Sequence, residues 1–268
     1  MTPADPITSL QNPRVKRLVK LRERRHRERE GVVLLDEARV IRRALDAGAD
    51  FGEVYVRTGA TGAAGADLAA ALRDAGAELV ELAPHVMAKA AYRDDPDGVL
   101  ALCAPPATGL DALSLPADAL VVVLENVEKP GNLGAVVRTA SGAGVDAVLA
   151  SGAGADPWNP NALRASTGAV FSVPLATASA AEIMDHLRRR SIRMVAADPE
   201  AGDSYAALDL TGPVAFVLGA EDAGLTAATR SAADVACRIP MRGAADSLNV
   251  SVSAAILVYE ARRQRDGA

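Results

Sequence analysis

The chain has 268 residues, half of them hydrophobic and 3% aromatic, which is enough for two domains with aliphatic cores. Its formal net charge of -5 argues against a nucleic-acid partner, because nucleic-acid-binding domains are usually basic. The sequence has no apolar run of about 18 residues, no secretory signal and no metal-like ligand spacing, which predicts a cytoplasmic protein without a membrane span or a metal.

The chain begins with a basic segment. Residues 7–30 predict one polar helix, which follows a turn at Asn12-Pro13 and is ended by Gly31. Residues 1–30 carry nine basic and four acidic side chains, a net charge of +5, so the other 238 residues carry -10 (-5 minus +5). The average charge therefore hides a basic arm on an acidic body, although charge runs of this kind usually form a solvated helix face.

The rest of the first half alternates between strand and helix patterns. We expect strands at Val32–Leu35, Glu53–Val56, Glu78–Leu82 and Val99–Ala104, and helices at Asp36–Ala47, Ala63–Ala75 and Pro84–Ala91. This spacing predicts an α/β/α sandwich over residues 1–104. The prolines, glycine and hydroxyl residues of 105–118 then predict an interdomain linker.

A second α/β domain is expected over residues 119–268. Ala119–Leu124 is a nearly continuous apolar run, which is typical of a parallel strand covered on both faces. Further strands are expected at Ala147–Ala150, Val170–Pro174, Arg193–Ala196, Val214–Leu218 and Val235–Ile239. The helices between and after them are expected at Gly134–Ser141, Pro160–Ser166, Ala180–Arg190 and from about Leu248 to Arg265.

Three loops rich in glycine and polar residues follow strands of this domain, at 125–140, 216–225 and 239–255. Open parallel sheets place their ligand sites at such strand ends. Taken singly, each loop also fits an ordinary turn, in which Glu221 or Asp222 caps one helix and Asp246 or Ser247 caps another. A dinucleotide fingerprint is excluded, because proline occupies position 157, where the third glycine would stand.

In their order along the chain and in their amino-acid sequences, the three loops resemble the motifs of the SpoU (TrmH-like) family of SPOUT RNA 2'-O-ribose methyltransferases. The segments that carry the resemblance are Asn132-Leu133-Gly134-Ala135 with Arg138-Thr139-Ala140, Gly219-Ala220-Glu221-Asp222-Ala223-Gly224, and Ile239-Pro240-Met241 with Ser247-Leu248-Asn249-Val250-Ser251. Residues 163–171 resemble the segment between the first two motifs. The opening residues 7–16 resemble members with an N-terminal L30e-like substrate-binding domain.

The resemblance implies a catalytic domain whose C-terminus is threaded into a deep trefoil knot, which periodicity alone does not reveal. It also implies a homodimer whose active sites draw residues from both subunits. S-adenosylmethionine is expected to bind in the knotted loops. The matching cofactor-binding positions are Leu218, Gly219, Ile239, Met241 and Leu248.

The resemblance further implies a catalytic set. Arg138 matches the arginine that either deprotonates the ribose 2'-hydroxyl or stabilises its developing charge, and charge stabilisation suits a group of such high pKa better. Asn132 is expected to organise this arginine and the substrate, and Glu221 to orient the arginine. Ser247 and Asn249 match residues that place the hydroxyl and support the cofactor loop.

The resemblance predicts that the basic N-terminal segment binds RNA. The expected RNA contacts are Arg14, Lys16, Arg17, Lys20 and Arg24, with Arg164 as a further phosphate contact. Two places in the sequence differ from many members of this family. Asp36-Glu37 stands where they have Glu-Gly, and Asp97 stands where they have Gln. These differences bear on RNA specificity rather than on methyl transfer.

The leading hypothesis is an S-adenosylmethionine-dependent 2'-O-methyltransferase of ribosomal RNA, most specifically 23S rRNA. A tRNA substrate, a non-catalytic RNA-binding protein on the same fold and a nucleotide-dependent oxidoreductase are the alternatives. The modified nucleotide stays open, as does the choice between a housekeeping role and protection of a ribosome from an antibiotic.

Overall fold

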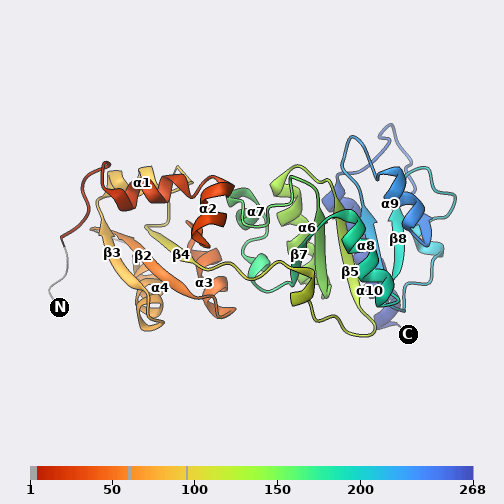
Figure 1. The fold of residues 1–268 in the computed structure, drawn as a ribbon, viewed down its shortest axis with the longest axis horizontal. Helices are drawn as coiled ribbons and strands as arrows, with labels where there is room; N and C mark the ends of the chain where they lie inside the picture. Colours follow the sequence, from red (N-terminus) through yellow and green to blue (C-terminus); the bar gives the residue numbers. More distant parts are fainter. Residues whose placement is uncertain (1–4, 60–61, 95, 268) are drawn as a thin grey trace. The chain divides into compact units, whose positions relative to one another are not determined.

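The computed structural model describes residues 5–59, 62–94 and 96–267. The chain forms two compact units (Figure 1). The first comprises Met1–Pro106 and Trp158–Ser172, and the second comprises Ala107–Pro157 and Val173–Ala268. The α/β class predicted from the sequence is confirmed in both units.

The first unit is built around a mixed four-stranded sheet in the order β1-β4-β2-β3. Strands β2 and β3 are parallel, whereas β4 runs antiparallel to β1 and β2. Its elements are α1 (Pro13–Lys20), α2 (Arg24–Glu30), β1 (Val33–Leu35), α3 (Ala38–Asp46), β2 (Phe51–Arg57), α4 (Gly62–Asp74), β3 (Glu78–Leu82), α5 (Pro84–Ala90), β4 (Val99–Cys103), α7 (Pro160–Ala165) and the short 3₁₀ helix η2 (Ala169–Phe171).

The two faces of this sheet are covered by different helices. Leu100 and Leu102 of β4 join a buried cluster with Val15 and Leu18 of α1 and Met87 of α5. Successive side chains of a strand point to opposite faces, so the other residues of β4 face the side of α3 and α4. The first unit is therefore an α/β/α sandwich, as expected.

The prediction of one helix over residues 7–30 is wrong. The chain forms two helices, α1 and α2, separated at Leu21, Arg22 and Glu23. Arg27 is buried, and its guanidinium Nη1 donates to the carbonyls of Leu21 at 3.0 Å and Arg22 at 2.7 Å. These bonds satisfy carbonyls that the break leaves without helical partners, so the break costs little.

The segment Trp158–Ser172 packs within the first unit, although it lies between two strands of the second. A strand at Val170–Pro174 was expected, but the chain forms η2 there. Thr167 and Gly168 have φ values of +52° and +88°, and a Cβ on Gly168 would lie 3.1 Å from Cβ of Arg43. This tight left-handed turn redirects the chain before an extended segment can form.

The domain boundaries expected from composition also differ from the contacts. The second unit begins at Ala107, inside the expected linker 105–118, and Leu113 of that segment is buried in the core of the second unit. A stretch rich in proline and glycine can thus still contribute a core side chain.

The second unit contains a six-stranded parallel sheet in the order β10-β8-β9-β5-β6-β7. Its elements are η1 (Leu110–Ala112), β5 (Leu120–Glu125), α6 (Pro130–Ala143), β6 (Ala147–Ser151), β7 (Leu175–Thr177), α8 (Ala180–Arg189), β8 (Arg193–Ala197), η3 (Tyr205–Ala207), β9 (Val214–Leu218), α9 (Ala227–Ala232), β10 (Val235–Cys237) and α10 (Val250–Asp266). Helix α9 was expected only in the alternative reading in which Glu221 or Asp222 caps it, and that reading is wrong, because the side chain of Thr226 caps α9.

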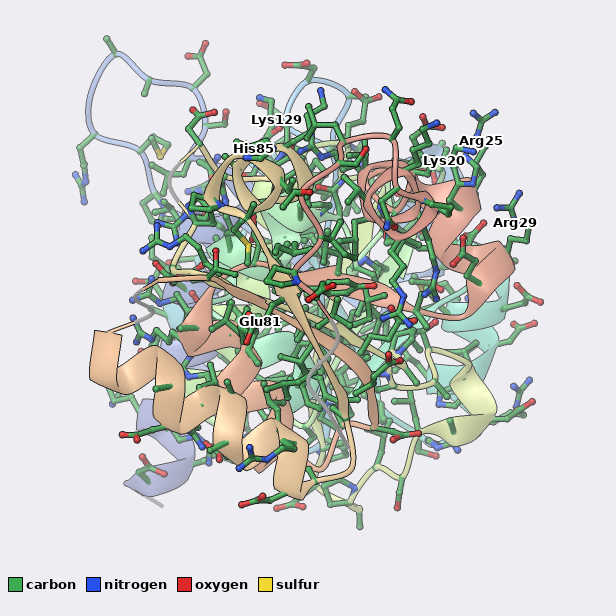
Figure 2. The ribbon with its side chains drawn as sticks, turned by 90° about the vertical axis from the view of Figure 1, so that its left-hand side faces the viewer. Lys20, Arg25, Arg29, Glu81, His85 and Lys129 are labelled. Atoms are coloured by element: carbon green, nitrogen blue, oxygen red, sulfur yellow. The ribbon has the colours of Figure 1, made fainter. Side chains whose placement is uncertain are left out.

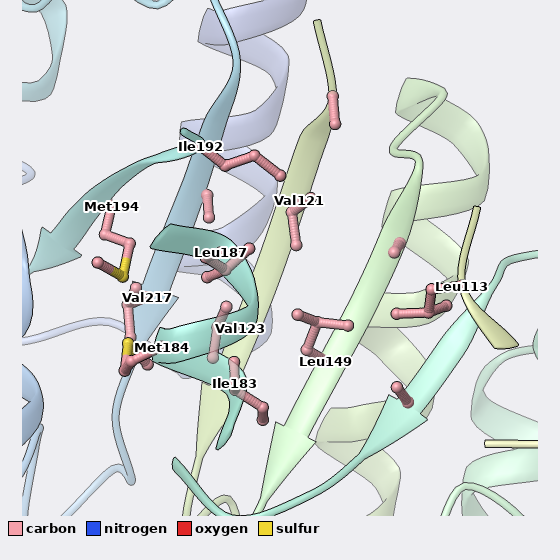
Figure 3. Close-up of a cluster of buried hydrophobic side chains, with 14 of the residues drawn as sticks. Leu113, Val121, Val123, Leu149, Ile183, Met184, Leu187, Ile192, Met194 and Val217 are labelled. Atoms are coloured by element: carbon pink, nitrogen blue, oxygen red, sulfur yellow. The ribbon is translucent and has the colours of Figure 1, made fainter. Parts of the chain in front are cut away.

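Helices cover both faces of this sheet. On one face, Ile183, Met184 and Leu187 of α8 pack over Val123 of β5 and Leu149 of β6 (Figure 3). Helices α6 and α10 pack against each other and against strands of the sheet on the other face. Burial on both faces explains the nearly continuous apolar sequence of the central strand β5.

The chain crosses the carboxyl edge of this sheet on its way to the last helix. Strand β10 lies at one end of the sheet, whereas α10 packs against α6, which follows the central strand β5. The connecting residues 238–249 therefore return past the ends of β8 and β9. This path is compatible with the trefoil knot implied by the resemblance, which stays a prediction.

Candidate active site

A pocket opens where β8, β9 and β10 end. Its volume is about 690 Å³, with the open solvent at its mouth included. The wall contains residues that follow all three strands together with the first turn of α10: Ala197, Asp198, Pro199, Leu218, Gly219, Ala220, Glu221, Gly224, Cys237, Ile239, Met241, Asp246, Ser247, Leu248, Val250 and Ser253. The carboxyl ends of parallel strands are the usual ligand site of such sheets.

All five residues predicted to bind the cofactor line this one pocket. Leu218 ends β9 and Gly219 follows it, while Ile239, Met241 and Leu248 come from the segment between β10 and α10. The three residues of that segment are half-buried, whereas most of their neighbours are exposed. Their apolar side chains therefore form the wall of the pocket.

The turn after β9 requires glycine. The main-chain nitrogen of Gly224 donates to the carbonyl of Ala220 at 2.8 Å, and Gly224 has a φ of +64°. A Cβ on Gly219 would overlap the carbonyl group of Gly224. Residues 219–224 thus fold back on themselves so closely that a side chain at position 219 has no room.

The segment before α10 leaves its main chain open to a ligand. In the described chain, no hydrogen-bond partner is found for any main-chain group from Ile239 to Leu248. Helix α10 is capped by Asn249, whose side-chain oxygen accepts from the nitrogen of Ser251 at 2.9 Å. The alternative reading, in which Asp246 or Ser247 caps this helix, is therefore wrong.

A polar cluster adjoins the pocket at Glu221, whose side chain is 21% exposed. Its carboxylate accepts hydrogen bonds from the side-chain amide of Asn132 and, at 3.2 Å, from that of Asn249. The same Asn249 nitrogen lies 3.3 Å from Oδ1 of Asn132, and Nζ of Lys129 lies 3.4 Å from Oε2 of Glu221. Two segments distant in sequence, residues 129–132 and the start of α10, thus converge on the carboxylate of Glu221.

Arg138 is not bonded to this cluster in the described part of the chain. It is an exposed residue of α6, and within the described part of the chain it makes no hydrogen bond or ion pair. Glu221 was expected to orient Arg138, but its carboxylate is instead held by Asn132, Asn249 and Lys129. Ser247, the remaining predicted catalytic residue, is exposed at the pocket wall.

Three charged residues of this region were not predicted from the sequence. Lys129 precedes α6 and pairs with Glu221. Asp198 lines the pocket, is 8% exposed and pairs with Nε of Arg230 at 2.9 Å. Glu125, 1% exposed, accepts from the nitrogen of Thr226 at 2.8 Å and so ties the loop after β9 to β5. A charge directly after an apolar strand was the available signal for Asp198 and Glu125.

The two cysteines are free, buried thiols, as expected. Cys237 lines the pocket, but burial raises its pKa to about 11, and burial likewise raises the pKa of Cys103 to about 12. Both therefore stay protonated at neutral pH, which makes them poor nucleophiles. Within residues 5–59, 62–94 and 96–267, no cluster of histidine, cysteine, aspartate and glutamate could hold a metal ion. The helices in these ranges are too short or too polar to cross a membrane.

The predicted RNA contacts of the first unit divide into two groups. Arg14, Arg17 and Arg24 form ion pairs with glutamates, Arg17 with both Glu30 and Glu53 at 2.6 Å. Lys16 and Lys20 are exposed and have no partner among the described residues, and Lys20 projects outward from α1 (Figure 2). Arg164 is exposed on α7 and donates to Asn161 at 3.3 Å.

Comparison with protein families yields two matches. Residues 119–259 match the SpoU rRNA Methylase family, and residues 12–101 match the MRM3-like substrate binding domain. Among curated proteins, the 23S rRNA (guanosine-2'-O-)-methyltransferase RlmB of Bordetella pertussis is 42% identical over 159 residues. The aligned part covers 59% of this chain and 64% of RlmB, so it spans less than two thirds of that enzyme.

Two solved structures resemble the whole chain. An RNA 2'-O ribose methyltransferase is 44% identical with a TM-score of 0.86, and the match covers 97% of this chain and 99% of that one. The SpoU methyltransferase AviRb from Streptomyces viridochromogenes, in complex with the cofactor AdoMet, is 30% identical with a TM-score of 0.90. That match covers 96% of this chain and 100% of AviRb.

Proposed function

The chain belongs to the SpoU rRNA methylase family, and on this premise we propose that it transfers a methyl group from S-adenosylmethionine to a ribose 2'-hydroxyl of 23S rRNA. One observation carries the proposal: the pocket at the carboxyl ends of β8, β9 and β10 adjoins the cluster of Glu221, Asn132 and Asn249. A cofactor site and a set of polar groups that can position a hydroxyl thus share one edge of the sheet.

The pocket suits S-adenosylmethionine. This molecule combines a flat adenine ring with ribose and amino-acid groups, and the pocket combines apolar walls from Ile239, Met241 and Leu248 with unpaired main-chain groups in the same segment. The tight turn at Gly219 brings further backbone to the wall. When bound, the cofactor supplies an activated methyl group on a sulfonium.

The protein's own contribution is orientation and charge. Glu221 lines the pocket, as Ser247 does, and it accepts hydrogen bonds from both asparagines, which fixes their amide groups. We assign to Asn132, Ser247 and Asn249 the placing of the ribose hydroxyl, and to Glu221 the positioning of the amides. A displacement on a sulfonium draws most of its acceleration from such positioning and from electrostatics.

Arg138 is assigned the stabilisation of the oxyanion that develops at the 2'-oxygen. A guanidinium stays protonated at neutral pH, which suits it to this role better than to that of a base. Because Arg138 is exposed and, among the described residues, is not bonded to the Glu221 cluster of its own chain, we propose that it serves the site of a second copy.

That second copy implies a homodimer. Helix α10 exposes Val252 and Tyr259, which are 47% and 52% accessible and lie seven residues, or about two turns, apart. The hydroxyl of Tyr259 lies beside Gly142 of α6, the helix that carries Arg138. An apolar strip at this place suits a symmetric contact between two copies that exchange their arginines.

The first unit is assigned the recognition of RNA. Its match to a substrate-binding domain supports this role, as do the exposed amino groups of Lys16 and Lys20. Arg14, Arg17 and Arg24 are weaker candidates than the sequence implied, because glutamates neutralise them. We place the activity in the cytoplasm, where ribosomal RNA is available.

The proposal is tested by mapping 2'-O-methylated nucleotides in total RNA from a deletion strain and its parent. The expected result is the loss of one methylated nucleotide from 23S rRNA, and its return when the gene is restored. The loss of a methylated nucleotide from tRNA instead would show that tRNA is the substrate. An unchanged methylation map would contradict the proposed activity. Growth of both strains with ribosome-targeting antibiotics separates a housekeeping role from a protective one.

A further inference from the structure

Two arginines share one tyrosine ring in the first unit. The guanidinium carbon of Arg22 lies 5.9 Å from the centre of the Tyr92 ring, and that of Arg164 lies 5.7 Å from it. Arg22 comes from the break between α1 and α2, Tyr92 from the loop before β4, and Arg164 from α7. A cation within about 6 Å of an aromatic face is attracted to it, so the ring holds both guanidinium groups in place.

Neither arginine is neutralised by a carboxylate among the residues that the structure describes. Nη2 of Arg22 donates to the carbonyls of Lys89, at 3.0 Å, and Ala91, while its Nε is buried without a partner. Arg164 is exposed, and it donates to the neutral side-chain amide of Asn161 at 3.3 Å. This contrasts with the arginines of α1 and α2 that pair with glutamates. Two unbalanced positive charges beside one ring attract an anion.

The loop that carries Tyr92 is fixed by a buried carboxylate. Asp36, 6% exposed, accepts from the main-chain nitrogens of Tyr92 at 2.9 Å and Arg93 at 2.8 Å. Asp97 accepts from the nitrogen of Ala38 at 3.0 Å and pairs with Arg93 at 3.2 Å. The two positions that depart from the pattern of relatives, Asp36 and Asp97, therefore both shape this loop.

The helix that carries Arg164 is fixed as well. Nη1 of Arg43 donates to the carbonyl and the hydroxyl of Thr167, each at 2.7 Å, directly after α7. Ser166 is fully buried, and its hydroxyl donates to the carbonyl of Leu163 at 2.9 Å. Both sides of the cluster are thus ordered before any ligand arrives, which lowers the entropic cost of binding.

We propose that Arg164 binds a phosphate of the RNA backbone, that Tyr92 is a positioning residue which aims the Arg164 guanidinium, and that Arg22 adds a second positive charge beside the ring. The inference rests on the proposed function, because it assumes an RNA substrate. A guanidinium is well suited to the contact, since its planar set of donors can grip two phosphate oxygens at once. The contact reads the backbone and not the base sequence.

The test measures binding of unmethylated, transcribed 23S rRNA fragments over a range of salt concentrations. Arg164→Gln is expected to weaken binding roughly tenfold, because a charge-assisted hydrogen bond is lost. It should also lower the slope of log affinity against log salt by about 1. Tyr92→Leu should weaken binding although it removes no charge, whereas Tyr92→Phe keeps the ring and should bind like the wild type.

The double variant Y92L/R164Q distinguishes positioning from a general structural effect. If Tyr92 acts through Arg164, the double variant binds no more weakly than Arg164→Gln alone. Arg73→Gln on α4 is the matched control, since its exposed arginine lies beside Asp74 and its loss should leave binding nearly unchanged. Circular dichroism and urea unfolding of each variant check that the first unit is folded.

Additive losses in the double variant would overturn the role of Tyr92, and an unchanged salt slope in Arg164→Gln would overturn the phosphate contact. Because Arg164 is exposed, this second result stands even if Tyr92→Leu does not fold. Methyl transfer by the wild type is measured in the same series. If it occurs while the variants bind normally, the inference fails and the proposed function stands. If the wild type neither binds nor methylates RNA, both fail.

Discussion

The side-chain amide of Asn132 donates a hydrogen bond to the carboxylate of Glu221, a residue 89 positions further along the chain. Asn249 reaches the same carboxylate from the start of α10, at 3.2 Å. The first turn of α6, the turn after β9 and the cap of α10 are therefore linked by one acidic group. This link joins the three sequence motifs at the wall of the pocket.

Removing the charge of Glu221 should impair catalysis more than cofactor binding. Glu221→Gln retains the shape of the side chain but removes the charge that pairs with Lys129 at Oε2 and weakens the bonds that Asn132 and Asn249 donate to Oε1. We expect kcat to fall roughly 100-fold, the scale of losing one preorganised polar group. Single-turnover methyl transfer measures this loss, and Glu81→Gln, an exposed carboxylate of the first unit, is the control. Wild-type kcat in Glu221→Gln would refute its role.

The proposed exchange of Arg138 between subunits predicts complementation. Arg138→Ala and Glu221→Gln should each be inactive as pure dimers. In a mixed dimer, the pocket of the Arg138→Ala subunit receives Arg138 from its partner and becomes complete. Random mixing of equal amounts should therefore restore roughly a quarter of the wild-type activity. If Arg138 acts within its own subunit, the mixture stays inactive.

The turn at Gly219 should tolerate no side chain. Gly219→Ala places a methyl group against the carbonyl of Gly224, so we expect a loss of about 1–3 kcal/mol in unfolding free energy, typical of overpacking. Affinity for S-adenosylmethionine should fall as well. Gly212→Ala is a matched control, because a Cβ there meets no atom within 4 Å. Equal calorimetric affinity for the two variants would contradict this account of the pocket.

The stability of the first unit should depend on the ionisation of Glu53. Burial acts to raise the pKa of this carboxyl, but hydrogen bonds from Tyr55 and Arg17 outweigh burial and lower it from 4.5. Because the folded pKa is depressed, the stabilisation is present above about pH 4.5 and is lost as pH falls through the folded value. Urea unfolding as a function of pH measures this loss. Glu53→Gln should remove that component of the acid sensitivity.

Local patterns predicted the strands better than the helix ends and turns. The limits of β3 and β9 agree with the prediction, because a glycine and a proline flank each segment and restrict the strand. The break in the first helix depends on Arg27, whose side chain reaches back to Leu21, and no propensity encodes that contact. The turn at Thr167 is likewise stabilised by Arg43, 124 residues away in sequence.

The site followed from the resemblance rather than from spacing. Each loop alone fitted an ordinary turn, and only the order of the three motifs indicated a shared function. The five predicted cofactor residues surround one pocket, whereas the partners of Glu221 differ from those expected. Lys129 and Tyr92 could not be singled out, because their importance arises from contacts with residues far apart in the chain.

The central claim is methyl transfer to a ribose hydroxyl, and nucleoside mass spectrometry tests it most directly. Purified protein is incubated with S-adenosylmethionine and 23S rRNA from the deletion strain, and the RNA is then digested to nucleosides. The account predicts one additional 2'-O-methylnucleoside with the wild type, formed roughly 100-fold more slowly with Glu221→Gln. A methyl group on a base, or no transfer by a folded wild type that binds both S-adenosylmethionine and RNA, would contradict it.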